Sequence, residues 1–69
     1  IRFSILRAEP VSVIVYDALG REVETLLNEN KQPGDYLVIF NGSSYDSGVY
    51  YLKLSTPNFS QVKTMVLLK

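Results

Sequence analysis

Apolar and polar residues alternate at every second position over most of the chain, which is the period of a β-strand. No stretch keeps a period of about 3.6 residues for long enough to predict a helix. The alternating rows predict strands at residues 1–5, 11–16, 21–27, 36–40, 49–54 and 59–69. Short strands at a spacing of about 8 to 12 residues favour a small antiparallel β-sandwich of about six to seven strands over a barrel. We therefore expect an all-β fold.

The strand patterns also predict which side chains face the core. The inward rows are expected to be Ile1, Phe3 and Ile5, followed by Val11, Val13 and Val15. Residues 36–40 are apolar on both faces, so we expect a central strand there, covered on both sides or packed against a neighbouring domain. The polar run at residues 28–32 is expected to be a connection between strands.

Residues with turn chemistry separate the strands. Asp17 offers a side-chain acceptor at the first position of a tight hairpin turn, and Gly20 stands at the fourth position, where a positive φ is often required. The Pro-Gly pair that ends at Gly34 suits a type II turn. Gly48 and Tyr50 have the spacing of the tyrosine corner of Ig-like sandwiches, in which a hydroxyl bonds to upstream backbone. We expect these five residues to define the turns and the corner.

The length and charge of the chain limit its partners. With 69 residues and 7.8 kDa, it has room for one hydrophobic core, so residues 1–69 are expected to be a single domain. Seven Lys and Arg balance seven Asp and Glu, so we expect neither a nucleic-acid partner nor attraction to an anionic membrane. The longest apolar run, residues 65–68, is far below the ~20 residues of a membrane span. The chain opens with Ile1 and shows no signal peptide, so we expect a segment cut from a larger secreted protein.

The sequence has few of the residue types that catalysis and metal binding require. The chain contains no Cys, His or Trp, so it lacks the thiolate ligand, the commonest general base and any disulfide. Serines flank Asp46, but nothing beside them can accept a serine proton at neutral pH. Glu22 and Glu24, two residues apart, are expected on one face of a solvated strand. We expect no enzymatic activity, no cofactor and no metal.

Two further patterns have ordinary structural explanations. Asn41 and Asn58 each begin an Asn-x-Ser motif for N-glycosylation, and chance matches are common in a chain rich in Ser and Thr. Tyr45, Tyr51 and Phe59 could form an aromatic platform for sugar rings, although aromatic side chains in a domain this small more often fill the core or cover a sheet.

The last predicted strand is the most informative segment. One face is expected to carry Lys63, Met65, Leu67 and Lys69, and the other Val62, Thr64, Val66 and Leu68. Such a strand could be a structural edge whose lysines discourage aggregation. Alternatively, it is a tag, in which edge backbone groups pair with a receptor strand while lysines and a free carboxylate supply charge specificity.

Several segments in this order resemble a known family. They are Ile-Arg-Phe-Ser at residues 1–4, the stretch at 11–23 that contains Tyr-Asp-x-x-Gly-Arg, Pro-Gly at 33–34, Ser-Gly-Val-Tyr-Tyr at 47–51 and the Lys-bounded apolar stretch at 63–69. Together they are similar to the type A C-terminal sorting domains of the type IX secretion system of Bacteroidetes and related bacteria. Such domains usually have an Asn-Pro-rich lead-in before the first strand, and we expect this sequence to start after it, so no cleavage position can be assigned. Ile14 and Ile39 also stand where such a domain would expose polar residues.

The resemblance implies an Ig-like β-sandwich that directs a carrier protein through the periplasm and across the outer membrane to the cell surface or exterior. It implies three partners: the secretion apparatus, a cell-surface sortase and the N-terminal carrier domain of the same protein. The family's recognition region maps onto Lys63, Met65, Val66, Leu67, Leu68 and Lys69, and its turn glycines onto Gly20, Gly34 and Gly48. The alternative is a non-catalytic Ig-like accessory module of a secreted hydrolase, which would orient a domain or bind carbohydrate.

Overall fold

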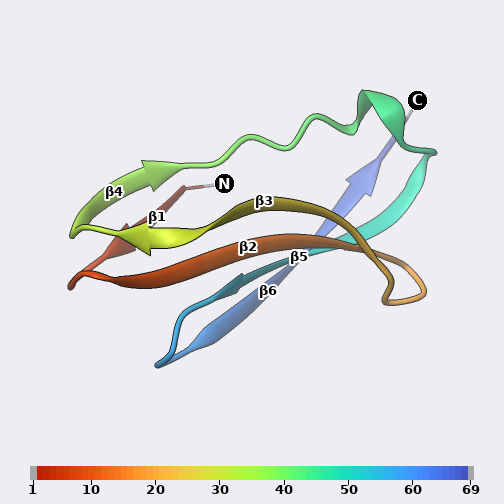
Figure 1. Cartoon of the computed structure of the whole chain (residues 1–69). Coiled ribbons are helices and arrows are strands. Elements are labelled where there is room, and N and C mark those ends of the chain that lie inside the picture. Colours follow the sequence, from red (N-terminus) through yellow and green to blue (C-terminus); the bar gives the residue numbers. More distant parts are fainter. Residues whose placement is uncertain (1, 69) are drawn as a thin grey trace.

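Two antiparallel sheets contain all the strands of the computed structural model, which describes residues 2–68 (Figure 1). The elements are β1 (Arg2–Ile5), β2 (Glu9–Asp17), β3 (Glu22–Lys31), β4 (Gly34–Leu37), the short 3-10 helix η1 (Gly42–Ser44), β5 (Gly48–Ser55) and β6 (Ser60–Leu67). Sheet order is β3-β2-β5-β6 in the larger sheet and β1-β4 in the smaller one. The expected all-β class and the expected number of strands are confirmed, and the arrangement is that of a small β-sandwich.

The core lies on the inner face of the larger sheet. Val11, Val13 and Val15 of β2 are almost completely buried, as the alternation predicts. On the neighbouring strand β5, Leu54 lies opposite Val13 and Leu52 opposite Val15, and both leucines are buried. Directly paired residues of an antiparallel ladder share a face, so these side chains form one continuous apolar layer.

The smaller sheet covers this layer from one side. Phe3 of β1 lies opposite Tyr36 of β4, and their rings stack with centroids 5.7 Å apart. Ile5 is buried, which confirms the inward row of β1 for the described residues, while Ile1 lies outside them. The Cα radius of gyration is 12.5 Å, against about 11 Å for a compact domain of this length. A two-stranded layer therefore covers a four-stranded one incompletely.

The expectation of a central strand at residues 36–40 is wrong. Strand β4 ends at Leu37 and pairs only with β1 among the described strands. Leu37 is 58% exposed and Ile39 is 76% exposed, so the second apolar row faces outward from the domain. Apolar residues on both faces indicate burial only where another layer covers each face, and within residues 2–68 no layer covers that side.

Strand β3 also differs from the sequence expectation. It continues through the polar run to Lys31, which pairs with Glu9, because an edge strand with one solvated face accepts polar residues. Register shifts interrupt its pairing with β2. Glu24 lies opposite Val15 before the second shift, and Glu22 lies opposite Tyr16 after it, so the two glutamates point to opposite faces. The expected shared face is wrong because a β-bulge reverses the alternation.

The turn glycines have the backbone geometry that only glycine adopts easily. Gly20 has φ of +83°, and its amide donates to the Asp17 carbonyl oxygen at 3.0 Å. Gly34 has φ of +153°, far from the ~+80° of a type II turn, so the expected turn type is wrong. A side chain is still disfavoured at that φ.

Candidate functional site

The exposed edge formed by β6 is the candidate site. In the described part of the chain, β6 pairs only with β5, over eight consecutive residue pairs and without a register shift. Figure 1 shows β6 as the outermost strand of the larger sheet. An edge strand has backbone N–H and C=O groups that no neighbouring strand uses.

The two faces of β6 differ in what they contact. Lys63 lies opposite Leu52 and Met65 opposite Tyr50, on the side of the core. Val62 and Val66 lie on the outer face, where both are more than half exposed. The expected division of the two faces is confirmed for residues 62–67. Lys69 lies outside the described residues.

Accessibility divides the five expected recognition residues that the structure describes into two groups. Lys63, Val66 and Leu68 are exposed, and Leu68 is 88% exposed. Met65 and Leu67 are partly buried and pack against the hydrophobic core. A partner that meets the folded domain can therefore contact the first group directly, while the second group holds the strand in place.

A contact with Gly42 of η1 positions Leu67, the last residue of β6. A Cβ placed on Gly42 would lie 2.8 Å from Cδ2 of Leu67, so the leucine occupies space that only glycine leaves open. The Oδ1 atom of Asn41 accepts a hydrogen bond from the Ser43 amide at 3.0 Å and caps η1. Sequence reasoning missed this contact, although an Asn-Gly-Ser loop is a turn signal.

The hydroxyl of Tyr50 supports the start of β5, the neighbour of β6. It donates to the Asp46 carbonyl oxygen at 2.9 Å, four residues upstream, and the side chain is 8% exposed. Gly48 has φ of +153° at the point where the strand begins. This is the geometry that a tyrosine corner requires.

Phe40 and Tyr45, in the connection between β4 and β5, form an aromatic cluster with Tyr50. Tyr45 stacks on Phe40 at 5.5 Å between centroids, and both rings contact Tyr50. The hydroxyl of Tyr45 donates to Oε1 of Glu24 at 2.7 Å, and this hydrogen bond to a carboxylate raises the pKa of Tyr45. The cluster joins the connection before β5 to strand β3.

Tyr45, Tyr51 and Phe59 do not form an aromatic platform for sugar rings. Tyr45 packs against the core, whereas Tyr51 lies on the outer face between Tyr16 and Thr64. Phe59 belongs to the turn between β5 and β6. The three aromatic side chains therefore do not share one surface.

Asp17 organises the hairpin between β2 and β3. Its Oδ1 atom accepts from the amides of Leu19 and Arg21, each at 2.9 Å, and its Oδ2 atom accepts from the Arg21 Nε at 2.8 Å. The hydrogen bond from the Arg21 amide is the main cause that lowers the pKa of Asp17, and the Arg21 guanidinium adds to it.

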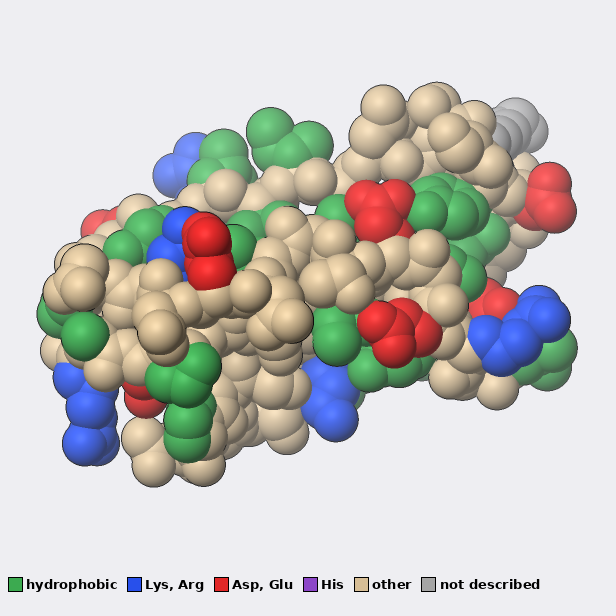
Figure 2. Space-filling view, viewed as in Figure 1, with side chains coloured by type: hydrophobic (Ala, Val, Ile, Leu, Met, Phe, Trp, Pro, Cys, Tyr) green, Lys and Arg blue, Asp and Glu red, His purple; other side chains and the backbone are tan. Residues whose placement is uncertain are grey.

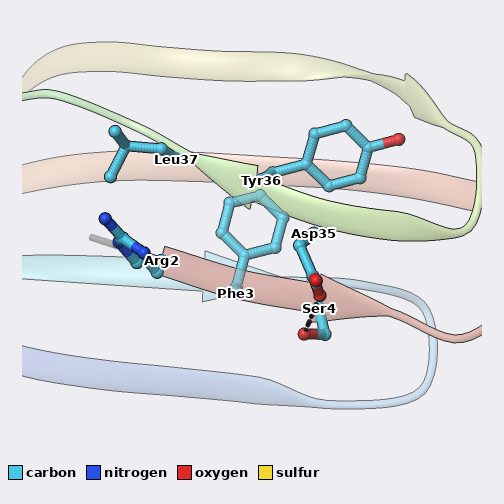
Figure 3. Close-up of a pocket in the computed structure, with 6 residues that line it drawn as sticks. All are labelled: Arg2, Phe3, Ser4, Asp35, Tyr36 and Leu37. Atoms are coloured by element: carbon cyan, nitrogen blue, oxygen red, sulfur yellow. Dashed lines mark hydrogen bonds between the residues drawn. The ribbon is translucent and has the colours of Figure 1, made fainter.

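A hollow over β1 and β4 has a volume of about 570 Å³ (Figure 3). It is lined by residues of these two strands alone, with the Phe3 and Tyr36 rings side by side and Ser4 donating to Asp35 at 2.6 Å. Figure 2 shows small separate groups of acidic and basic side chains, without a broad patch of one sign on this face.

Residues 2–68 also show neither a metal-binding cluster nor a membrane-spanning helix. Within that range, no group of three or more acidic, His or Cys side chains is placed to hold a metal ion. The same residues form no helix with the length and apolar character of a membrane span.

Comparison with known proteins identifies the family. The model of the secretion system C-terminal sorting domain matches residues 1–68. Searches of curated proteins and of solved structures each found no match. The family match covers all of β6 as well as the turns that support it, and this family is not a catalytic one. The chain therefore belongs to the family of secretion system C-terminal sorting domains.

Proposed function

We propose that this domain, a sorting signal for type IX secretion, is recognised through β6 and the residues that follow it. The recognition residues are then Lys63, Met65, Val66, Leu67, Leu68 and Lys69. The observation that carries this proposal is the free, regular edge of β6, which presents exposed Lys63 and Val66 beside unpaired backbone groups. The secretion apparatus is the partner that the family implies.

The remaining parts of the route belong to the same proposal. The domain is attached to an N-terminal carrier domain, which it brings from the periplasm across the outer membrane to the cell surface or exterior. A cell-surface sortase then removes it. The domain itself contributes no catalysis, which agrees with a site made of strand-edge groups and apolar side chains. The turn and corner residues Asp17, Gly20, Gly34, Gly48 and Tyr50 keep β5 and β6 in the recognised shape.

Export of the full-length protein tests this function. Removing residues 63–69 should leave the protein in the periplasm, but it also removes the core contacts of Met65 and Leu67. A second variant therefore replaces only exposed side chains, Lys63→Ser, Val66→Ser and Leu68→Ser together. Its control is Leu19→Ser, which changes a side chain of similar exposure in the β2–β3 turn. Retention of the triple variant with export of the control supports the proposal, and normal surface export of the deletion refutes it.

A further inference from the structure

The backbone groups on the free side of β6 can be assigned to residues. The Thr56 amide donates to the Phe59 carbonyl oxygen at 2.8 Å, which makes these two residues a hydrogen-bonded pair beside the turn. Bonded and non-bonded pairs alternate along an antiparallel ladder. Lys63 and its partner Leu52 are therefore a bonded pair, and the N–H and C=O groups of Val62, Thr64 and Val66 point to the free edge.

The same three residues expose β-branched side chains on the outer face. Val62 is 57% exposed, Val66 is 61% exposed, and Thr64 between them is also exposed. A strand added to this edge would place its own side chains directly beside them. Cross-strand pairs of this kind are most favourable between β-branched and aromatic residues.

On the inner face, Lys63 limits which strand can be added beside β6. It is exposed and lies opposite the buried Leu52. The ion pairs among residues 2–68 are Arg21–Asp17 and Lys31–Glu29, so Lys63 belongs to neither. The β5–β6 hairpin carries Lys53 and Lys63 but no Asp or Glu. A strand that is purely apolar on this face would desolvate the ammonium group without compensation.

Lys63 also opposes pairing of β6 with a second copy of itself. In an antiparallel pair centred on Thr64, the two Lys63 side chains would lie on one face in diagonal positions, about 7–8 Å apart. A register centred on Lys63 would place them directly opposite each other. The other free edge, β3, has register shifts and three glutamates, which discourage strand addition there.

We propose that β6 accepts an extended segment of a partner protein as a fifth strand of the larger sheet. The segment carries a carboxylate facing Lys63 and β-branched or aromatic side chains facing Val62, Thr64 and Val66. Main-chain hydrogen bonds hold the segment, and the pair between its carboxylate and Lys63 selects it over other extended chains. This inference rests on the proposed function, because it describes how a component of the export route meets the signal.

The test uses the purified full-length protein and two labelled eight-residue peptides of alternating Thr and Val. One peptide has a central Glu on the Lys63 face, and the other has Lys at that position. Fluorescence anisotropy should show about tenfold tighter binding of the Glu peptide. The variant Lys63→Glu, at an exposed position, should reverse this preference. Equal binding of both peptides by the parent and the variant, or no binding of either, overturns the proposal.

The backbone part of the proposal has its own variants. Thr64→Pro removes an N–H that points to the free edge and leaves the hydrogen bonds to β5 in place, so peptide binding should fall about tenfold or more. Thr64→Val keeps the N–H and should bind normally. Equal binding by the two variants overturns strand addition. If peptide binding fails while removal of residues 63–69 still blocks export, the sorting function stands and only this mode of recognition falls.

Discussion

The hydroxyl of Tyr50 provides the sharpest test of how the domain holds its last two strands in position. Tyr50→Phe removes only the oxygen that donates to the Asp46 carbonyl at 2.9 Å. The ring remains in its 8% exposed site against Tyr45 and Phe40. The substitution therefore isolates one hydrogen bond from the packing around it.

The expected cost follows from the surroundings of that bond. A hydrogen bond inside a protein contributes about 0.5–1.5 kcal/mol net to stability. Asp46 is an exposed residue, so water can partly replace the lost donor at its carbonyl oxygen. We expect the free energy of unfolding to fall by about 1 kcal/mol. For a domain of this size, that corresponds to a decrease of roughly 4–8 °C in Tm.

Thermal unfolding followed by circular dichroism measures this change, and Tyr51→Phe is the matched control. Tyr51 is the next residue of the same strand, and within residues 2–68 its hydroxyl makes no hydrogen bond. The control should remain within about 0.5 kcal/mol of the parent. Equal melting temperatures for Tyr50→Phe and the parent would remove Tyr50 from the role of corner residue.

Two further predictions concern the turns. Gly48→Val should lower the free energy of unfolding by about 1–3 kcal/mol because φ is +153°, and since no atom lies within 4 Å of an added Cβ, the cost is backbone strain. Urea unfolding measures it, and a variant as stable as the parent contradicts it. The lowered pKa of Asp17 means that its contribution to stability is present above the unfolded pKa of 3.8 and is lost as pH falls through the lower folded value. Asp17→Asn should therefore make stability less dependent on pH below about 4, and parallel acid unfolding curves for parent and variant would contradict this.

The sequence predicted best where one local rule decides the structure. Val11, Val13 and Val15 stand at every second position and are all buried, because every second residue of a strand faces the same side. The hairpin at Asp17 and Gly20 follows from a side-chain acceptor and a residue that adopts positive φ, both of which are visible in four residues.

The sequence predicted poorly where a distant partner decides the structure. Leu37 and Ile39 indicated a covered strand, but coverage depends on how many strands the second layer has. The reversal between Glu22 and Glu24 depends on a bulge that appears only when β3 is paired with β2. The contact of Gly42 with Leu67 joins residues far apart in the chain, so no local pattern could indicate it.

That last contact has a consequence for how the signal is presented. Leu67 belongs to the segment proposed for recognition, and its side chain also packs against Gly42 of η1. A larger residue at position 42 would force the Leu67 side chain to move. The recognition segment would then change its conformation although its sequence is unchanged. Misfolding at this end of the domain would therefore also disturb the segment proposed for recognition.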